Sequence, residues 1–514
     1  MQATVLSATL RGVEALSVEV QADVGPGLPS FGIVGLGDAA VLEARDRVRS
    51  ALRAAGYEFP NARVLVNLAP APLRKHGTGF DLPIALAVLH ATHQLAQAAT
   101  QGCTVVGELA LDGSVRAVPG LLAYALAASR NGLDLMGPAE VSSAVGAVGS
   151  ISCRVVEHLS DLRRGWRSVA PCSLQRPTQL SQQPDLCEVS GHAQARRALE
   201  IAAAGGHNLL MTGPPGSGKT MLARRLPGIL PPLSEGERLE TALVHSVAGL
   251  DESAALAGVR PFRAPHHSCS TAGLVGGGTP PRPGEMSLAH NGVLFLDELP
   301  EYAPSALQAL RAPLEDGKVT LVRAEGRLEF PCRFTLVAAM NPCPCGYHGD
   351  PDRRCTCTPS TIARYRARVG GPLFDRMDMV LTVARVDPRT IVAGAEGEDS
   401  QTVRDRVLSA RDFAFATRDA LSSVLSGTKL RDACSLRDDA IATLTSAARR
   451  HHLSGRGVTR VLRVARTIAD LDHARRVHRE HIAEALQYRL TEEPWTTGCV
   501  RPNCTAAGPV TPSG

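Results

Sequence analysis

The chain has few aromatic residues, no long apolar run and no large charge excess. Aromatic residues make up 4% of its 514 residues, so the sequence offers no aromatic-rich platform on which single-stranded bases stack. The formal net charge of +5 permits binding to nucleic acid but does not by itself indicate it. A hydrophobic share of 44% and a charged share of 20% are typical of a folded globular protein, and the length predicts more than one domain.

Membrane and export signals are also missing from the pattern. The most apolar helical stretch, Leu82–Leu89, is interrupted by His90 and His93 and is too short to span a membrane. Met1 is not followed by a basic segment with an apolar core, so we expect no secretory signal and no membrane partner. We therefore expect a cytoplasmic protein, in which clustered cysteines are more often metal ligands than disulfides.

The most specific feature that is present is a phosphate-binding loop (P-loop). It comprises Gly213, Pro214, Pro215, Gly216, Ser217, Gly218, Lys219 and Thr220. Its glycines let successive backbone N–H groups point at phosphates, Lys219 adds a positive charge, and Thr220 offers a hydroxyl to Mg²⁺. The helix that follows adds the positive end of its dipole. The sequence therefore predicts ATP and Mg²⁺ as cofactors.

Two later apolar runs end in polar residues, which is typical of buried parallel strands that deliver groups to one edge of a sheet. Gly292–Leu296 is followed by Asp297 and Glu298, and 334–340 is followed by Asn341. We expect Asp297 to hold the Mg²⁺ shell, Glu298 to polarise the attacking water and Asn341 to sense the γ-phosphate. A surface strand end that happens to carry two acids is the alternative for Asp297 and Glu298.

Two arginines complete the predicted catalytic set. Arg376 is expected to act as a finger in a neighbouring subunit's site, and its alternative role is a salt bridge to Asp375 or Asp378. Arg456, or in its place Arg460, is expected to reach the nucleotide from a helical lid, although basic residues on exposed helix faces are commonly only solvated. If Arg376 acts in trans, the active unit is a homo-oligomeric ring, which we expect to be a hexamer.

Periodicity and composition divide the chain into five segments. We expect an α+β domain over 1–165, a linker over 166–189, an ATPase core over 190–385, a helical lid over 386–490 and a disordered tail over 491–514. Within them, 39–55 and 82–98 are expected to be helices, and 318–334 is expected to form a two-stranded hairpin.

The order of P-loop, acidic strand end, sensor asparagine, finger arginine and lid resembles the AAA+ superfamily, and the long insertion before Asp297 resembles its magnesium-chelatase branch. The chain is most similar to the YifB/ComM family of magnesium-chelatase-like AAA+ ATPases, over nearly all residues up to about 490. The motifs that carry this resemblance are Asn67–Ala71, Phe80–Ala85, Arg263–His267, Asn341–Gly346 and Arg463–Leu471.

This resemblance implies a hexameric motor on single-stranded or branched DNA, with helicase or branch-migration activity in recombination or natural transformation. The hairpin residues Arg323 and Arg327 would then act on the DNA. A magnesium-chelatase-like motor subunit and a protein-remodelling ATPase are the alternatives.

The N-terminal segment further resembles the proteolytic domain of Lon. Gly79 stands where that family has its serine nucleophile, and Leu122 stands where it has its lysine base. A hydroxyl nucleophile needs a base within hydrogen-bond reach, so we expect no peptidase activity, with Thr78 as the one neighbouring hydroxyl. Together the resemblances predict an α/β fold, namely an AAA+ P-loop ATPase core with a C-terminal helical lid, preceded by a Lon-protease-like (S5-type) α+β domain.

Four cysteines form two Cys-x-Cys pairs separated by nine residues: Cys343, Cys345, Cys355 and Cys357. Four thiolates in a short loop can bind a structural Zn²⁺ tetrahedrally. Free thiols, or His348 in place of one cysteine, are the alternatives. The basic residues near this loop are predicted to contact DNA phosphates. The alternative is a run of solvated charges. These residues are Arg353, Arg354, Arg364, Arg366 and Arg368.

Overall fold

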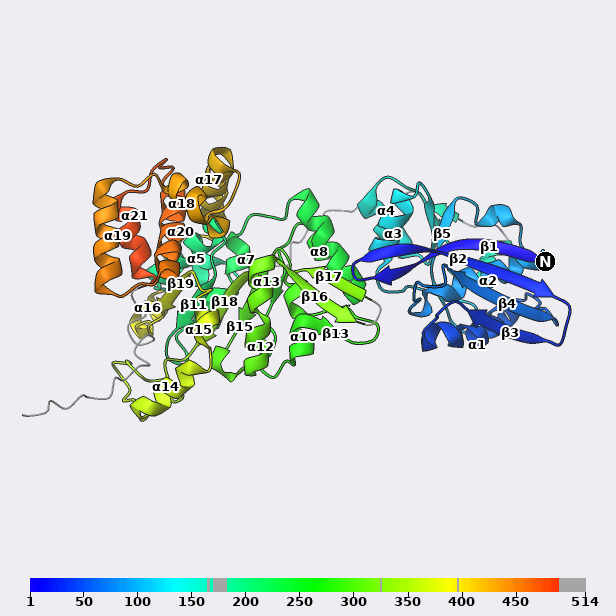
Figure 1. The fold of residues 1–514 in the computed structure, drawn as a ribbon, viewed down its shortest axis with the longest axis horizontal. Coiled ribbons are helices and arrows are strands. Elements are labelled where there is room, and N and C mark those ends of the chain that lie inside the picture. Colours follow the sequence, from blue (N-terminus) through cyan, green and yellow to red (C-terminus); the bar gives the residue numbers. More distant parts are fainter. Residues whose placement is uncertain (164–166, 170–182, 324–325, 395–396, 490–514) are drawn as a thin grey trace, which may run out of the picture. The chain divides into compact units, whose positions relative to one another are not determined.

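The computed structural model describes residues 1–163, 167–169, 183–323, 326–394 and 397–489 (Figure 1). The chain forms two compact units, each assembled from segments that are distant in sequence. The first unit comprises Met1–Gln183, Pro231–Phe295 and Ser305–Thr335, and the second comprises Pro184–Leu230, Leu296–Pro304 and the chain from Leu336 onward. The tail expected to be disordered, 491–514, lies outside the described residues, as does most of the expected linker.

An eight-stranded sheet forms the N-terminal part of the first unit, with the strand order β10-β9-β8-β5-β1-β2-β4-β3. Alternate residues of its strands are buried, as in Val18, Val20 and Ala22, because β-branched and small apolar side chains pack one face of a pleated sheet. The strands are β1 Gln2–Arg11, β2 Glu14–Gly25, β3 Ser30–Val34, β4 Arg63–Ala69, β5 Cys103–Val105, β8 Asp134–Gly137, β9 Cys153–Val155 and β10 Arg167–Val169. The last of these lies beyond residue 165, where the sequence predicts a linker.

Four helices pack on this sheet, and their bounds are α1 Ala39–Ala54, α2 Asp81–Ala91, α3 Leu121–Arg130 and α4 Val141–Val148. Every residue of α2 is buried, and Asp81 in its first turn accepts hydrogen bonds from Arg47 of α1 at 2.7 and 2.9 Å. The helix expected to reach residue 98 ends at Ala91. It ends there because His93 adopts a left-handed conformation, with φ of 56°, so that the N–H of Gln94 donates to the carbonyl of Leu89 at 3.0 Å and closes the last turn.

The rest of the first unit consists of short helices and strands around the helix α8, Glu235–Ala248. A capping box between Ser234 and Glu237 begins α8. The expected hairpin is present as the antiparallel strands β16 and β17. The further elements are α9 Ser253–Leu256, β12 Phe262–Arg263, α10 Thr271–Val275, β13 Gly276–Gly277, β14 Arg282–Pro283, α11 Glu285–Leu288, β15 Val293–Leu296, α12 Pro304–Ala309, α13 Arg311–Asp316, β16 Lys318–Arg323 and β17 Gly326–Pro331.

Helix α3 of the N-terminal sheet domain is docked on α8. The backbone N–H of Gly120 donates to the carbonyl of Ser246 at 2.8 Å, and the N–H of Leu122 donates to the Ser246 hydroxyl at 3.3 Å. The Leu122 side chain is fully buried in an apolar cluster with Leu233 and Ala242. The docking therefore combines apolar burial with hydrogen bonds from the first N–H groups of α3, which have no partner within the helix.

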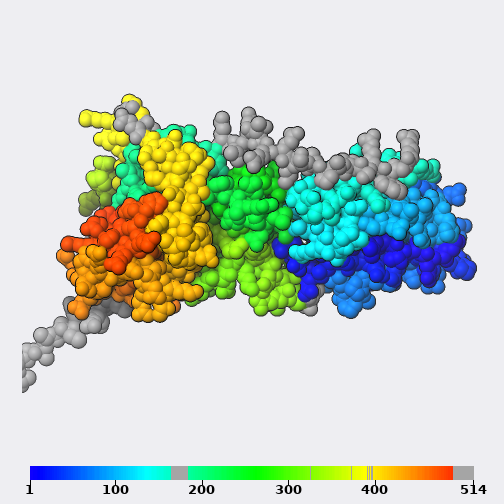
Figure 2. Space-filling view, turned by 90° about the horizontal axis from the view of Figure 1, so that it is seen from above, coloured from blue at the N-terminus to red at the C-terminus, as the bar shows by residue number. Residues whose placement is uncertain are grey.

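The second unit contains a parallel sheet and a helical C-terminal part. Strand β11 lies between β18 and β19 and is parallel to both. In the C-terminal part, α20 packs on α17 and α21, and α21 also packs on α19. Figure 2 shows α17 in yellow and α19, α20 and α21 in orange to red. The elements are α5 Ala193–Gly205, β11 Leu209–Thr212, α6 Lys219–Ala223, α7 Leu226–Ile229, β18 Thr335–Met340, α14 Pro359–Ala367, α15 Gly371–Phe374, β19 Met379–Thr382, α16 Pro388–Ala393, α17 Ser400–Arg418, α18 Gly427–Cys434, α19 Asp438–Arg450, α20 Gly455–Leu471 and α21 Arg479–Gln487.

The docking of α3 on α8 generates a stability prediction. Leu122→Lys should lower the free energy of unfolding by roughly 3 kcal/mol, because it buries an ammonium group that has no acidic partner in this cluster. The matched control is Leu111→Lys in the same domain, where the side chain is 63% exposed and the change should cost less than about 0.5 kcal/mol. Denaturant unfolding of both variants measures the difference, and equal stability of the two would contradict the docking.

Candidate nucleotide-binding site

The P-loop joins the buried strand β11 to helix α6, and each of its glycines is required for a different structural reason. A Cβ on Gly213 would lie 2.1 Å from the carbonyl oxygen of Val383, so only glycine allows this close approach of two backbones. Gly216 and Gly218 adopt left-handed conformations with φ of 76° and 85°, and Gly218 is the N-cap of α6. The local chain therefore forms a glycine-dependent turn into a helix N-terminus.

The Lys219 side chain is almost fully buried beneath this turn. Its Nζ donates to the carbonyl oxygens of Gly213 at 2.8 Å and Pro214 at 3.0 Å, and to Oδ1 of Asn341 at 3.3 Å. Burial lowers the pKa of Lys219, while the charges of Asp297 and Glu298 act in the opposite direction. The structure thus brings the predicted sensor residue Asn341, at the end of β18, within hydrogen-bond distance of the P-loop lysine.

Thr220 and Asp297 are also brought together. The Thr220 hydroxyl donates to Oδ2 of Asp297 at 2.6 Å, and the backbone N–H of Glu298 donates to Oδ1 of the same carboxylate at 2.9 Å. Glu298 itself is exposed and has a left-handed backbone, with φ of 50°, at the point where the chain leaves β15. A hydroxyl beside a carboxylate is a donor set that suits Mg²⁺, which prefers hard oxygen ligands.

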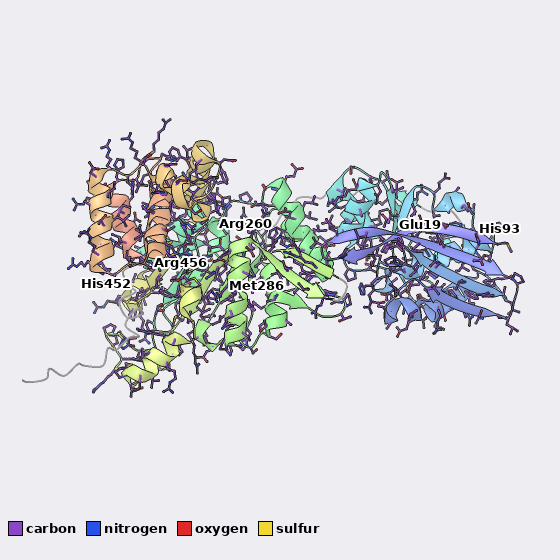
Figure 3. The ribbon with its side chains drawn as sticks, in the orientation of Figure 1. Glu19, His93, Arg260, Met286, His452 and Arg456 are labelled. Carbon is purple, nitrogen blue, oxygen red and sulfur yellow. The ribbon has the colours of Figure 1, made fainter. Side chains whose placement is uncertain are left out.

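Asp375 links the two predicted arginines, because it forms an ion pair with Arg456 and directly precedes Arg376 in the chain. Arg456, labelled in Figure 3, is exposed at the start of α20 and forms an ion pair with Asp375 at 3.1 Å. Arg376 follows Asp375 directly, is half-buried, and its backbone carbonyl accepts a hydrogen bond from Asn208 at 3.2 Å. Asp375, one of the two alternative partners considered for Arg376, is thus paired with Arg456. Arg460 pairs with the other, Asp378.

Asp378 joins the parallel sheet to the helical C-terminal part, a role that the sequence pattern does not indicate. Its carboxylate accepts from the backbone N–H of Asn208 at 3.0 Å, lies 3.7 Å from the His207 imidazole and pairs with Arg460 of α20. Burial raises the pKa of Asp378, but His207 and Arg460 outweigh it and hold the pKa at about 2. His207 in turn contacts the Thr467 hydroxyl at 2.7 Å, also on α20.

A second buried ionic cluster explains part of the motif over 463–471. Arg466 is buried, and its Nε donates to Asp470 at 3.1 Å, one turn further along α20. Arg418 of α17 donates to the same carboxylate, at 2.9 Å from Nη1. These residues hold helices of the C-terminal part together and have no contact with the P-loop among the interactions of the described residues.

The four cysteines of the loop after Asn341 converge. Their sulfur atoms all lie within 4.8 Å of one another, and all four thiols are free of disulfides. The sulfur of Cys343 lies 3.3 Å from that of Cys345 and 3.7 Å from that of Cys355. The backbone N–H of Tyr347 is the main cause that lowers the pKa of Cys345, to about 5, so this sulfur is readily ionised.

The motif Arg263–His267 and the basic residues near the cysteine loop have mixed environments. Arg263 forms a bidentate pair with Glu285, with both distances at 2.7 Å. Arg366 is half-buried and donates to the carbonyl of Pro342 at 3.2 Å. The other four arginines near the loop are exposed, and they are Arg353, Arg354, Arg364 and Arg368.

Comparison with protein families matches three segments of the chain. Residues 185–391 match the family described as magnesium chelatase, subunit ChlI, and residues 20–140 match subunit ChlI of Mg-chelatase. Residues 397–489 match the C-terminal region of the same subunit. The fold and the site therefore define a magnesium-chelatase-like protein of AAA+ type, a class of ATPase that implies ATP and Mg²⁺ as cofactors.

Whole-chain relatives narrow this class. The chain is 43% identical over 486 residues to the uncharacterized protein YifB of Salmonella typhimurium, and the aligned region covers 94% of this chain and 96% of the relative. It is 41% identical over 498 residues to the competence protein ComM of Haemophilus influenzae, covering 95% and 97%. The chain belongs to the YifB/ComM family of magnesium-chelatase-like proteins, which confirms the family predicted from its motifs. No helix in the described part of the chain is long and apolar enough to cross a membrane.

The Asp378 network generates the second prediction. Asp378→Asn should lower the free energy needed to open α20 by roughly 3 kcal/mol, because it leaves the Arg460 guanidinium buried without its counter-charge. Asp375→Asn is the matched control, since it removes an exposed ion pair with Arg456 worth less than about 1 kcal/mol. Amide hydrogen exchange in α20 measures both effects.

The same comparison has a pH dependence. The folded pKa of Asp378, about 2, lies below the ordinary value of 3.8, so the stabilisation is present above pH 4 and is lost as the pH falls toward 2. The difference between wild type and Asp378→Asn should therefore shrink below pH 4. A difference that stays constant with pH would contradict a charged Asp378 in the folded protein.

Proposed function

We propose that this chain is an ATP-hydrolysing AAA+ motor that assembles as a hexamer and acts on single-stranded or branched DNA. Helicase or branch-migration activity in recombination or natural transformation would be its output, and the cytoplasm its location. The observation that carries the proposal is the convergence of Lys219, Thr220, Asp297 and Asn341 from three strand ends. Such a cluster can bind a nucleoside triphosphate with its metal and respond to the γ-phosphate.

Each remaining residue has a role in this proposal. Glu298, exposed next to the Asp297 carboxylate, polarises the attacking water. Arg376 acts as a finger in the neighbouring subunit's site, and Arg456 acts as the second sensor from α20. The ion pair between Arg456 and Asp375 supports a link between these two, because a movement of α20 would be felt directly beside Arg376.

The case for DNA rests on charge and on family. The exposed arginines of the cysteine loop and α14 offer charges to a phosphate backbone, while aromatic residues for base stacking are scarce. Binding should therefore be dominated by phosphate contacts and should weaken strongly with salt. The hairpin residues Arg323 and Arg327 are also exposed, although Arg327 pairs with Glu329 at 2.8 Å.

The second candidate is a magnesium-chelatase-like motor subunit that remodels a partner protein, a reading favoured by the family matches over all three segments. Proteolysis is disfavoured. We assign the N-terminal sheet domain to the Lon-like, S5-type class, but Gly79 and Leu122 occupy the two positions where a dyad is expected. The Thr78 hydroxyl, beside Gly79 in the chain, donates to the Glu108 carboxylate and not to the lysine amine that the Lon-like dyad uses.

The cofactors in this proposal are ATP, Mg²⁺ and one structural Zn²⁺. Sulfur atoms bound to zinc at about 2.3 Å in a tetrahedron lie about 3.8 Å apart, close to the separations among Cys343, Cys345 and Cys355. Backbone N–H groups of Tyr347 and Thr356 donate to the Cys345 sulfur, and this type of bond stabilises a thiolate ligand.

ATP turnover with and without a four-way DNA junction tests the motor. Lys219→Ala should abolish ATP binding, because it removes the charge at the phosphates. Glu298→Gln should keep ATP binding and lower kcat by about 100-fold, because it removes the group that polarises water. Wild-type turnover should rise when the junction is added, and branch migration of the junction should depend on ATP hydrolysis.

The salt dependence of DNA stimulation and the binding of DNA separate the two candidate functions. DNA stimulation that disappears between 50 and about 200 mM salt fits phosphate contacts. If DNA neither binds nor changes the turnover of active wild-type protein, the DNA motor is wrong and the protein-remodelling candidate stands in its place.

Mixed oligomers test the finger. Subunits with Arg376→Ala retain an intact P-loop with its Lys219, and subunits with Lys219→Ala retain Arg376. If Arg376 acts in trans, mixing the two inactive variants should restore a measurable fraction of wild-type ATP turnover. Mixtures that stay as inactive as either variant alone, in particles shown to contain both by sequential purification through two different affinity tags, would place the finger role elsewhere.

A further inference from the structure

The cysteine loop is a structural neighbour of the P-loop as well as a metal-binding candidate. It begins at Cys343, two residues after Asn341, whose side chain accepts from Lys219. Gly346 within the loop lies directly against Pro215. A Cβ on Gly346 would come within 2.6 Å of Pro215 Cδ, a distance that real side chains do not tolerate.

A second contact joins the loop to the same part of the P-loop. Asp350, whose side chain is 1% exposed, lies 3.7 Å from Nε of Arg385, and Arg385 Nη2 reaches the carbonyl oxygen of Pro215 at 3.5 Å. The Tyr347 ring lies against Arg385 and also against Arg353, whose Nη1 donates to the Tyr347 hydroxyl at 2.9 Å. The loop therefore contacts Pro215 both by packing and through a charged side chain.

Apart from these contacts, the loop is held by turns, such as the hydrogen bonds from the N–H groups of Asp352 and Arg353 to the Asp350 carboxylate at 2.9 and 3.1 Å. Residues 341–358 contain no helix or strand, and the apolar core contributes mainly through Cys343, which is fully buried. A loop of this kind keeps one conformation when a metal links its ends, because metal binding supplies the folding free energy that packing does not. The two Cys-x-Cys pairs lie on either side of Gly346, Tyr347 and Asp350, the residues that reach the P-loop.

We propose that a zinc ion held by Cys343, Cys345, Cys355 and Cys357 fixes this loop against Pro215 and so positions the P-loop and Asn341 for ATP hydrolysis. The inference rests on the proposed ATPase function and assigns the metal a positioning role in it. The P-loop backbone and Lys219 also bind the nucleotide, so zinc affects nucleotide affinity as well as the geometry of hydrolysis. By linkage, a bound nucleotide also holds the zinc loop in place.

Two glycine variants isolate the contact from the metal. Gly346→Ala retains all four thiols but adds a methyl group toward Pro215. Gly349→Ala is its matched control in the same loop, because its φ of 79° resembles the 86° of Gly346 while no atom lies within 4 Å of the added Cβ. Both variants carry the same kind of backbone strain, and only the first presses on the P-loop.

The experiment measures zinc per chain by mass spectrometry, kcat, and the Kd for a fluorescent ATP analogue in full-length protein purified without chelator. Wild type and both glycine variants should contain one zinc per chain, and Cys357→Ser should contain little. Gly346→Ala and Cys357→Ser should lower kcat by about tenfold or more, since a small misplacement of reacting groups is costly. Both should also raise Kd by about fivefold, because the coupling between zinc and nucleotide is reciprocal. Gly349→Ala should behave as wild type.

A readout that does not depend on hydrolysis completes the test. A non-hydrolysable ATP analogue should slow the removal of zinc by a chelator from wild type but not from Lys219→Ala. Wild-type protein without zinc, or equal kcat in Gly346→Ala and Gly349→Ala, would overturn the positioning role. Wild type that holds zinc and is protected by the analogue yet hydrolyses no ATP would instead refute the proposed function and leave the coupling of the two sites intact.

Discussion

The buried ammonium group of Lys219 is the constraint around which the nucleotide site is arranged. A positive charge removed from water must be compensated by nearby oxygen atoms, and three of them come from Gly213, Pro214 and Asn341. Two belong to the P-loop itself, and the third lies at the end of another strand. The neighbouring strands β11 and β18 must therefore stay in register, since a slip of one residue would take Asn341 away from the lysine.

The C-terminal helices are tied to this sheet by charge at the opposite ends of the same strands. Asp378 precedes β19 and accepts a hydrogen bond from the backbone N–H of Asn208, which precedes β11. Arg460 of α20 forms an ion pair with the same carboxylate. A buried ion pair of this type specifies one arrangement rather than adding much net stability, because its desolvation offsets most of the attraction. The apolar face of α20 packs on α5 and α17, and the polar contacts of Asp378 fix its position relative to the sheet strands.

Much of the site could be predicted because its signals are local. The P-loop, Asp297 and Asn341 each follow a short apolar run, and the pairing of parallel strands was enough to expect them together. The roles of Asp378, Arg385 and Tyr347 could not be predicted, because each depends on contacts between segments far apart in the chain. The helix expected over 82–98 was drawn too long for a different reason, since His93 turns to a left-handed conformation that the residue pattern does not signal.

The zinc site and the arginine finger are predictions from the sequence, and the fold adds to each the contacts of the residues involved. For the zinc site, spacing suggested four ligands, and only the fold revealed that Gly346 lies against Pro215. For Arg376 and Arg456, the fold adds that Asp375 lies between them in the chain of contacts.

The docking of α3 on α8 has a consequence for how this family can vary. Leu122 belongs to the N-terminal sheet domain and Ser246 to an insertion more than a hundred residues later, yet they share a hydrogen bond and an apolar cluster. A change in the apolar side chains of one segment therefore alters the fit of the other. An N-terminal domain exchanged for that of a distant relative should dock well only if the facing residues of α8 are exchanged with it.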